Sequence, residues 1–282
     1  MGAFGGASVR EALDSAVIAI AASGSQTPRL DAEVLLAAAL GLDRTALFMD
    51  PGRAVTGPAV RVFQDAVRRR SAGREPVAYI TGTRGFRHIE LAVDARVLVP
   101  RPETELLVEI GVELIACGAR VADIGTGSGA IALALASERP DLHVVATDIS
   151  ADALAVARAN AARLGLGERV AFVQGDLLAG VGDVDVVLSN PPYVAEGDRA
   201  SLAPDIMRHE PPAALFAGAD GLDVIRRLVP AAAASGTRLL AVELGQGQAP
   251  AVAELMGAAG FAEVEARRDL AGIERVVVGR RS

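Results

Sequence analysis

Apolar residues recur at helical spacing through the first part of the chain, where they lie three and four positions apart. This spacing is typical of the buried face of an amphipathic helix. Clusters rich in Ser, Asp, Pro and Gly interrupt the pattern, and Asp43 or Thr45 is placed to begin a short additional helix. The pattern predicts a small helical bundle over residues 1–75. Its principal helices are expected at 10–21, 30–40 and 59–70.

Residues 76–100 have a different pattern, in which β-branched and aromatic residues are punctuated by glycine. Val77 and Tyr79 open this stretch, and Phe86 and Val97 continue it. Such residues favour extended strands, and the intervening glycines favour turns. We therefore predict a β-hairpin linker between the bundle and the rest of the chain.

Residues 101–282 show predicted strands alternating with predicted helices, and a helix over 104–116 precedes the first strand. By the usual connection rules, this alternation gives an α/β fold with a mostly parallel sheet and right-handed crossovers. Only a short turn separates the last two strands, so one of them should run antiparallel to the others. The strands of this seven-stranded sheet are expected at 120–124, 143–148, 170–174, 184–189, 238–244, 262–267 and 275–279.

The composition is that of a globular protein, because 51% of the 282 residues are hydrophobic and 22% are charged. Acids or glycines interrupt each apolar stretch before it could cross a bilayer, so no transmembrane helix is expected. The N-terminal residues lack the basic and apolar pattern of a secretory signal, which leads us to expect a cytoplasmic protein.

All 28 basic residues are arginine. The absence of lysine excludes a pyridoxal-phosphate Schiff base, a P-loop lysine and the lysine of protein kinases. Acids outnumber the arginines, giving a formal net charge of −7, and the excess lies C-terminal to Glu75. A nucleic-acid partner is therefore disfavoured, because proteins that bind phosphate backbones usually present a basic face.

Cysteine and histidine form no recognisable catalytic or metal-binding set. Cys117 has no second cysteine with which to form a disulfide, and its Ala-Cys-Gly context predicts a small buried residue at a helix end. His88, His143 and His209 show neither the paired spacing of zinc ligands nor a spacing that links one of them to Cys117. We expect no metal site.

A glycine-rich segment follows the first predicted strand and precedes a helix at 130–137. It reads Asp123-Ile124-Gly125-Thr126-Gly127-Ser128-Gly129. Glycine lets backbone amides approach a ligand closely at a helix N-terminus, which indicates a nucleotide-like ligand. Dinucleotide-binding folds and methyltransferases share such loops, so the pattern alone does not separate the two classes.

Two further acids end the next two predicted strands. Asp148 is placed to accept both ribose hydroxyls of an adenosine, and Asp176 is placed to accept from an adenine amino group. Ile149 and Leu177 follow these acids and are assigned to the same cofactor site, as is Asn190 after the fourth predicted strand. For a single acid, a helix N-cap is the better explanation. Three acids at successive strand ends, counting Asp123, favour a ligand at the carboxyl edge of the sheet.

The fourth predicted strand ends in Ser189-Asn190-Pro191-Pro192-Tyr193, the most specific signal in the chain. An amide or exocyclic amine nitrogen has a delocalised lone pair, so it attacks a methyl sulfonium only when it is oriented in line and relieved of conjugation. The Asn190 side-chain oxygen and the Pro191 carbonyl can each accept one N–H, in a backbone frame fixed by proline. Tyr193 can stack on the planar acceptor. Orientation and discharge of the sulfonium supply the rate, so neither a general base nor a metal is required.

With these residues, the chain resembles the release-factor glutamine methyltransferase family over nearly its whole length. The resemblance implies a Rossmann-like class I methyltransferase domain, S-adenosyl-L-methionine as cofactor, and the glutamine of the Gly-Gly-Gln tripeptide of peptide chain release factors as substrate. It also implies that Arg101 and Glu103 belong to the substrate site. Besides the glycine-rich segment and 190–193, it rests on Tyr79-Ile80-Thr81-Gly82, Val99-Pro100-Arg101-Pro102-Glu103-Thr104-Glu105 and His209-Glu210-Pro211.

One departure from the family pattern concerns Gly85, which precedes Phe86 where many relatives carry an acid. It affects only a local contact in the linker. The bundle of residues 1–75 carries none of the implied chemistry, so we expect it to recognise the substrate or to serve as a stabilising cap.

Two alternative functions stay open. An adenine-N6 nucleic-acid methyltransferase shares Asn-Pro-Pro-Tyr, but it would need basic clamps around a flipped base, and the acidic C-terminal part disfavours them. A noncatalytic nucleotide-binding protein would use only the glycine-rich segment, and the intact motif at 190–193 disfavours that function.

Overall fold

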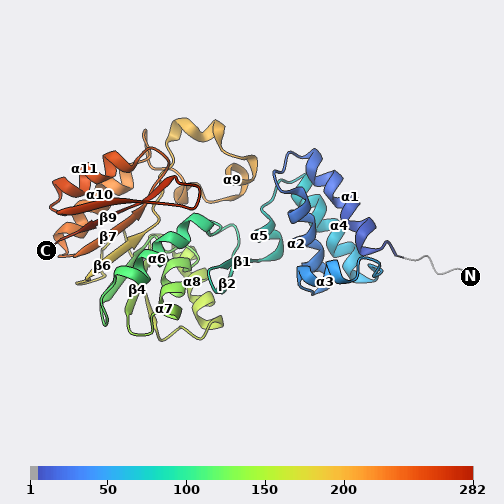
Figure 1. Cartoon of the computed structure of the whole chain (residues 1–282), viewed down its shortest axis with the longest axis horizontal. Helices are drawn as coiled ribbons and strands as arrows, with labels where there is room; N and C mark the ends of the chain where they lie inside the picture. The colour runs from blue at the N-terminus through green and yellow to red at the C-terminus, as the bar shows by residue number, and fades with distance from the viewer. Residues whose placement is uncertain (1–5, 282) are drawn as a thin grey trace, which may run out of the picture. The chain divides into compact units, whose positions relative to one another are not determined.

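The structure, a computed structural model, describes residues 6–281 and divides into two compact units. The first unit comprises the chain up to Gly82 together with Ala203–His209, and the second comprises Thr83–Leu202 and the chain from Glu210 onward. Figure 1 traces the elements in chain order. The division into domains after residues 75 and 100 stays a prediction. The grouping of Ala203–His209 with the first unit was not anticipated from the sequence.

The first unit contains the helical bundle that the hydrophobic pattern predicts. The apolar faces of its helices meet in one buried core, to which α1 contributes Leu13 and Ile20, α2 contributes Leu36 and α4 contributes Phe63. Burial of these faces stabilises helices that would be marginal in isolation. The helices are α1 (Val9–Ala22), α2 (Pro28–Leu40), α3 (Arg44–Met49), α4 (Pro58–Ser71) and α5 (Val77–Thr81).

Capping residues explain several helix boundaries in the bundle. The Ser8 hydroxyl accepts from the Glu11 N–H and the Glu11 carboxylate accepts from the Ser8 N–H, which forms a capping box at the start of α1. Asp43 accepts the Ala46 N–H at 2.8 Å, so the prediction of a short helix beginning there is confirmed. Gly41 ends α2 in the left-handed conformation that favours glycine.

The segment α5 is helical, although its β-branched and aromatic residues predicted an extended strand. That part of the linker prediction is wrong. The Pro76 carbonyl accepts the N–H groups of Tyr79 and Ile80 at 3.0 and 3.1 Å, and Gly82 ends the turn with a φ of 76°. Tyr79 is buried and Ile80 packs against the core of the bundle. Tertiary burial therefore outweighs a weak strand propensity.

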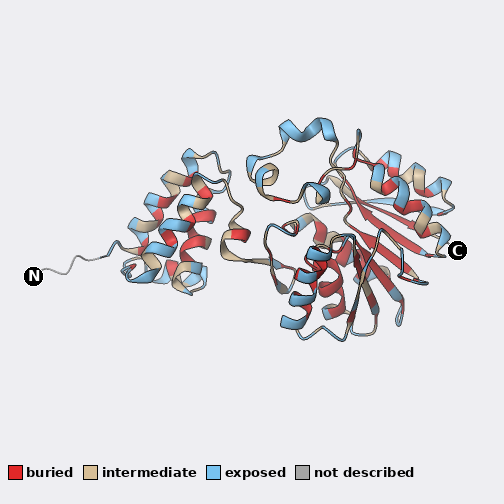
Figure 2. Ribbon diagram, turned by 180° about the vertical axis from the view of Figure 1, so that it is seen from behind, coloured by how far each residue is buried: buried red, intermediate tan, exposed pale blue. Residues whose placement is uncertain are grey.

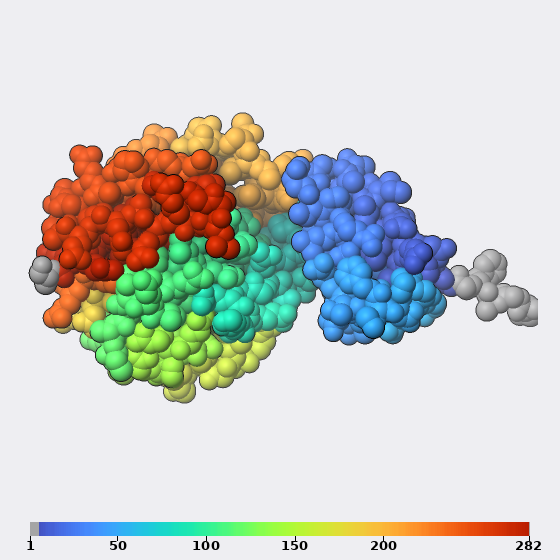
Figure 3. All heavy atoms as spheres, viewed as in Figure 1, coloured from blue at the N-terminus to red at the C-terminus, as the bar shows by residue number. Residues whose placement is uncertain are grey.

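The predicted hairpin is present within narrower bounds, as β1 (Thr83–Phe86) paired antiparallel with β2 (Ile89–Ala92). It belongs to the second unit, where the Asn160 amide both accepts from the Ala92 N–H and donates to the Ala92 carbonyl. In Figure 3 the teal hairpin lies against the green surface of this unit. Gly85 is exposed, and an added Cβ there would meet nothing within 4 Å, so the departure from the family pattern falls at an open position.

A buried ion-pair cluster holds the segment Ala203–His209, which contains α9 (Pro204–His209), within the first unit. Arg70, whose side chain is 8% exposed, donates to Asp31 at 2.7 Å and to Asp205 at 2.9 Å. Arg74 donates to the other oxygen of Asp205 at 2.7 Å. A buried guanidinium needs such partners, because an unpaired charge in the interior is costly.

The second unit is built on the seven-stranded sheet that the sequence predicts, with spatial order β5-β4-β3-β6-β7-β9-β8. The neighbours from β5 to β7 pair in parallel, and β9 pairs antiparallel with both β7 and β8. The prediction that one of the last two strands runs antiparallel is therefore confirmed. The strands are β3 (Arg120–Ile124), β4 (His143–Asp148), β5 (Val170–Gln174), β6 (Val186–Ser189), β7 (Leu239–Glu243), β8 (Glu263–Arg268) and β9 (Glu274–Arg280).

Helices cover both faces of this sheet, with α10 and α11 on one side and α6, α7 and α8 on the other (Figure 1). Figure 2 shows the buried residues concentrated in the strands and on the helix faces turned toward them, as expected for a parallel sheet. The helices are α6 (Glu105–Leu114), α7 (Ala130–Glu138), α8 (Ala151–Arg163), α10 (Asp223–Ala234) and α11 (Ala249–Ala258), with short 3-10 turns at η1 (Pro102–Thr104), η2 (Glu196–Ser201) and η3 (Pro212–Ala214).

Cys117 is exposed, so the prediction that it is a small buried residue is wrong. The reason is that α6 ends at Leu114 and Ile115 is already extended, which places Cys117 in the turn before β3 rather than at the helix end. Within residues 6–281, none of the helices is long and apolar enough to cross a membrane.

Candidate active site

The parallel strands bring the candidate residues to one edge of the sheet. Asp176 follows β5, Asp148 ends β4, the glycine-rich segment follows β3, Asn190 follows β6 and Glu243 ends β7. Because these strands are parallel neighbours in the order β5-β4-β3-β6-β7, their carboxyl ends form a continuous row. Ligands of open α/β sheets bind at this edge.

The glycine-rich segment is held from within the protein. The N–H groups of Gly125 and Thr126 donate to the Thr147 carbonyl at 2.9 and 2.8 Å, and the Gly127 N–H donates to Asp148 at 2.9 Å. The glycine pattern predicts that backbone amides of this segment face a ligand, whereas these three already have protein acceptors. A cradle for pyrophosphate needs free amides, so this arrangement disfavours a dinucleotide.

The glycines of this segment instead let a ligand approach its backbone closely. Gly125 and Gly127 have positive φ values of 75° and 57°, and an added Cβ at either position would meet nothing within 4 Å. The side chains of Thr126 and Ser128 are buried. The open side of the turn is therefore free of side chains at both glycines, which suits a ligand that lies directly against the backbone.

Asp123 supports the segment from below the surface. Its carboxylate accepts the Thr126 hydroxyl at 2.6 Å and the Ala132 N–H at 3.1 Å. Its Oδ1 atom is buried and has no hydrogen-bond partner among the described residues. Burial raises the pKa of Asp123 to about 7, against the lowering effect of these hydrogen bonds. Asp123 thus orders the turn through its Oδ2 atom, while its Oδ1 atom could still accept a hydrogen bond.

Asp148 connects the ends of neighbouring strands. Its Oδ2 atom accepts from Gly127, and its Oδ1 atom accepts the Ser150 N–H at 2.9 Å. Each carboxylate oxygen has a second lone pair, so Asp148 keeps the capacity to accept from a ligand hydroxyl. The next residue, Ile149, is 67% exposed, which places a large apolar side chain beside this carboxylate.

Asp176 and Leu177 follow β5 at the end of the row. Asp176 is exposed and forms an ion pair with Arg227. Leu177 has a φ of 54°, an uncommon conformation for a residue with a side chain, and its carbonyl accepts the Thr147 hydroxyl at 3.1 Å. A non-glycine residue held in this way is a local strain that is found preferentially at functional sites.

The Asn-Pro-Pro-Tyr motif begins directly at the end of β6. The Ser189 hydroxyl donates to the Ile124 carbonyl at 2.7 Å, which fixes this strand end to the start of the glycine-rich segment. The Nδ2 atom of Asn190 donates to Oγ1 of Thr104 at 3.0 Å. Pro191 is buried, whereas Asn190 and Pro192 are half-buried. The motif and the glycine-rich segment therefore belong to one site.

Tyr193 is held at both ends. Its hydroxyl donates to Oε1 of Glu243 at 3.2 Å, and its carbonyl accepts Nε2 of Gln248 at 3.0 Å. An added Cβ at Gly221 would lie 2.2 Å from that carbonyl oxygen, so the backbone packs too closely there for any other residue. Burial and the neighbouring Glu243 carboxylate raise the pKa of the Tyr193 hydroxyl, which keeps it protonated as a donor.

Arg101 and Glu103 lie on either side of Pro102 at the start of η1. Arg101 donates to both carboxylate oxygens of Glu210, at 2.6 and 2.7 Å, and the Glu210 side chain is almost fully buried. Burial raises the pKa of Glu243, and the negative charge of the half-buried Glu103 raises it further. The two family motifs that contain Arg101 and Glu210 are thus joined by an ion pair.

Three residues of this site were not identified from the sequence: Thr104, Glu243 and Gln248. Glu243 had a recognisable signal, because it is a single acid in a strand that is otherwise wholly apolar. Burying a charge is costly, so an acid in such a strand indicates a specific task. Thr104 and Gln248 had no recognisable signal in the sequence, since the residues that they contact are distant in sequence.

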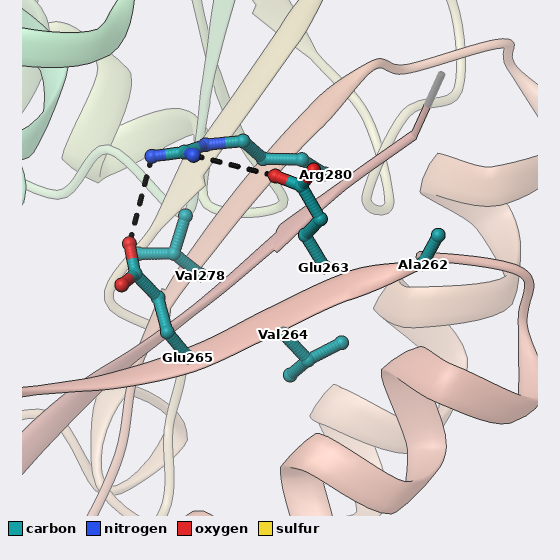
Figure 4. Close-up of a pocket in the computed structure, with 6 residues that line it drawn as sticks. All are labelled: Ala262, Glu263, Val264, Glu265, Val278 and Arg280. Carbon is teal, nitrogen blue, oxygen red and sulfur yellow. Dashed lines mark hydrogen bonds and ion pairs between the residues drawn. The ribbon is translucent and has the colours of Figure 1, made fainter.

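Two hollows on the second unit lie elsewhere. Figure 4 shows one on the outermost strands, lined by residues of β8 and β9, in which Arg280 forms ion pairs of 3.5 Å with Glu263 and Glu265. Three strands separate β8 from β3, and the charge of this arginine is already compensated. The other hollow is lined by Arg120 and His143, at the beginnings of β3 and β4, which is the opposite edge of the sheet. Neither is part of the active site.

Comparisons with known proteins agree with this geometry. Two family models match the chain, the PrmC N-terminal domain over residues 11–82 and the methyltransferase small domain over residues 102–249. Among solved structures, the hMettl16 catalytic domain in complex with a MAT2A 3′UTR hairpin is 16% identical, with a TM-score of 0.57 over 81% of this chain and 83% of that chain. Such a likeness shows the class I methyltransferase fold alone.

Curated relatives are far more similar in sequence. The release factor glutamine methyltransferase of Rhodospirillum rubrum is 43% identical over 95% of this chain and 84% of its own length. The protein of the same name from Deinococcus radiodurans is 43% identical over 97% of this chain and 99% of its own length. On this evidence, the chain belongs to the release factor glutamine methyltransferase family.

Proposed function

We propose that this protein transfers a methyl group from S-adenosyl-L-methionine to the side-chain amide nitrogen (N5) of the glutamine in the Gly-Gly-Gln motif of a peptide chain release factor. The observation that carries the proposal is the position of Asn190 to Tyr193. The motif stands at the carboxyl end of β6, next to a glycine-rich segment that suits close contact with a ligand. The names of the curated relatives favour this acceptor over adenine N6.

The residues along the sheet edge fit the cofactor. Gly125 and Gly127 leave the backbone open to the methionine part, and Asp148 has lone pairs available for the ribose hydroxyls. The exposed Ile149 offers an apolar surface to the adenine ring, and Asp176 together with Leu177 borders the end of the row. When bound, the cofactor supplies a methyl group on a positively charged sulfonium.

Asn190 and Pro191 orient the acceptor in this proposal. With its Nδ2 donating to Thr104, the Asn190 amide has its oxygen free to accept one N–H of the substrate glutamine. The Pro191 carbonyl accepts the other, and Tyr193 stacks on the planar amide, while Pro192 fixes the backbone between them. These contacts direct the nitrogen lone pair at the methyl group, so orientation provides most of the rate enhancement.

Arg101 and Glu103 contribute to the substrate side of the site. Arg101 is bound to Glu210 through one terminal nitrogen, so its other guanidinium N–H groups are available to substrate carbonyls. Glu103 is half-buried and adds negative charge on the same turn. We assign both residues to binding of the glutamine-containing loop rather than to the chemical step.

The helical first unit is proposed to recognise the rest of the substrate protein. It carries large apolar side chains on its surface, among them Phe48 and Met49 at the end of α3, which are 55% and 80% exposed. Exposed apolar side chains of this size mark protein-binding surfaces when they cluster. The unit contains none of the residues assigned above to the cofactor or the amide.

A methylation assay with mass mapping tests the proposed function. The protein is incubated with isotopically labelled S-adenosyl-L-methionine and an intact release factor, and the modified residue is identified by peptide mass spectrometry. Label on the glutamine of Gly-Gly-Gln is expected. A release factor in which this glutamine is replaced by glutamate serves as the control and should take up no label. Label on a nucleic acid added to a parallel incubation, with none on either factor, would contradict the proposal.

A further inference from the structure

Glu243 is a buried acid whose charge is only partly compensated. It ends β7, is 1% exposed, and its Oε1 atom accepts the Tyr193 hydroxyl at 3.2 Å. Its Oε2 atom has no hydrogen-bond partner among the described residues. Burial raises the pKa of Glu243 to about 7. An arrangement this costly is not explained by packing, because an apolar residue would stabilise the strand better.

Thr104 links Glu243 to the Asn190 amide. It is buried at the end of η1, its Oγ1 atom accepts Nδ2 of Asn190 at 3.0 Å, and its hydroxyl is one of the groups that lower the pKa of Glu243. An ionised carboxylate only accepts hydrogen bonds, so it draws the Thr104 proton toward itself. The Thr104 oxygen is then left to accept, and the group that Asn190 turns toward it must be the NH₂.

Thr104 acts on the Glu243 carboxyl and is bonded to the Asn190 amide, so it bears on which way that amide faces. The two ends of a carboxamide have the same shape and differ only in donating or accepting. We propose that Glu243 is a positioning residue for methyl transfer, which acts through Thr104 to keep the Asn190 oxygen on the acceptor side and through the Tyr193 hydroxyl to hold the aromatic ring. The inference rests on the proposed function, because it assigns these residues to orientation of the substrate amide.

Protonation of Glu243 removes this control. A neutral carboxyl group can donate to Thr104, which lets the Thr104 hydroxyl donate to the Asn190 oxygen and the amide turn by half a rotation. The groups that act on Glu243 are Thr104 and the charged Glu103 on η1, Tyr193 after β6, and Arg275 on β9, whose positive charge lowers the pKa. Turnover should therefore fall as the pH drops below about 7, the pKa to which burial raises Glu243.

Variants at Thr104 test whether Glu243 acts on Asn190 through this side chain, because they change its hydroxyl group and keep its size nearly the same. Thr104→Val keeps the volume and removes the hydroxyl, so the Asn190 amide loses its fixed orientation. We expect kcat for a Gly-Gly-Gln peptide to fall about a hundredfold, the scale for a misplaced reacting group, with little change in KM. Thr104→Ser restores the hydroxyl and should recover most of kcat. Calorimetric titration with S-adenosyl-L-methionine should give nearly the wild-type affinity for both variants, since the glycine-rich segment, Asp148 and Asp176 are unchanged.

The pH profile of kcat provides the second readout. The wild-type enzyme should show a loss of kcat on the acid side, and Glu243→Gln should abolish this pH dependence. The variant should also lower kcat at pH about 8. A glutamine amide can either donate to Thr104 or accept from it, so it does not fix the direction in which Thr104 donates. Glu265→Gln is the matched control, a Glu exposed on β8, and should keep both the wild-type kcat and its acid-side loss.

The outcomes separate this inference from the proposed function. If the wild-type protein methylates no glutamine, the proposed function and the inference both fail. If the wild-type protein is active and Thr104→Val matches its kcat, the inference alone is overturned. It is also overturned if Thr104→Ser binds the cofactor normally but stays as slow as Thr104→Val, or if Glu243→Gln retains the acid-side loss of kcat.

Discussion

The Asp123 carboxylate accepts the Thr126 hydroxyl at 2.6 Å, within the turn that carries the glycine-rich segment. This bond and the Ala132 N–H order the turn, yet they do not offset the burial of the carboxylate, whose pKa is raised to about 7. The same edge of the sheet holds Glu243, whose pKa is raised to about 7 for the same reason. The candidate active site therefore contains two acids that burial destabilises in their ionised form.

These two acids should make the protein less stable as the pH rises from about 5 to 8. An unfolded Asp or Glu titrates near pH 4, so between that pH and 7 the native state binds more protons than the unfolded state. The free energy of unfolding then falls with increasing pH. Denaturant titrations at pH 5 and 8 measure this difference, and Asp123→Asn should reduce it without abolishing it, because Glu243 still contributes.

Asp141→Asn is the control for the pH experiment. The guanidinium of Arg139 holds the pKa of Asp141 far below its usual range, so this acid does not titrate between pH 5 and 8 in either state. The variant should keep the wild-type difference between the two pH values. A wild-type protein as stable at pH 8 as at pH 5, with Asp123→Asn behaving identically, would contradict the assignment.

Asp148→Ala should weaken the binding of S-adenosyl-L-methionine by about 1.5–3 kcal/mol, the range for hydrogen bonds to a charged group. The substitution also removes the acceptor of the Gly127 N–H, which acts in the same direction. Isothermal titration calorimetry measures the effect. Asp152→Ala, an exposed acid in the first turn of α8, is the matched control and should bind normally. Equal affinities for the two variants would place the ribose elsewhere.

Asn190→Ala should leave cofactor affinity nearly unchanged and lower kcat at least about a hundredfold, the scale for losing one positioned polar group from a transition state. The physical reason is the loss of one of the two acceptors that orient the substrate amide. Single-turnover kinetics with a Gly-Gly-Gln peptide, combined with calorimetry, separates the two effects. Turnover within a few-fold of wild type would rule out this orientation mechanism.

Phe48→Ser combined with Met49→Ser should raise KM for an intact release factor while leaving the kinetics of a short Gly-Gly-Gln peptide unchanged. Removing this pair of apolar side chains from a binding surface should cost about 1.4 kcal/mol in total, so a rise of about tenfold in KM is expected. Leu270→Ser, at a fully exposed apolar position of the second unit, is the control and should affect neither substrate. If both substrates lose turnover equally, the first unit acts as a stabilising cap.

Local pattern was sufficient for the order and type of most elements. The strands β3, β4 and β5 have the predicted bounds, because each is a short run rich in β-branched and apolar residues between turn signals, which favours a strand. The motifs that mark the site are also local. Asp148 and Asn190 end their strands, so their placement at one sheet edge followed from the parallel connection rules alone.

The hydrophobic pattern predicted the wrong local structure where burial against distant residues outweighed the local conformational preference. The residues of α5 favour strands by composition. In the helical conformation, however, Tyr79 is buried and Ile80 packs against the core of the bundle, and this burial contributes more free energy than the strand preference. Cys117 became exposed because α6 ended earlier than its apolar content suggested.

The sequence by itself therefore determined the order of helices and strands and the residue types that its motifs place at one sheet edge. Only the tertiary structure joined Asn190 to Thr104, Tyr193 to Glu243 and Arg70 to Asp205. These contacts link residues that are 86, 50 and 135 positions apart. No periodicity encodes such pairs, because a hydrogen bond depends on the meeting of two side chains that only the packed core brings within reach.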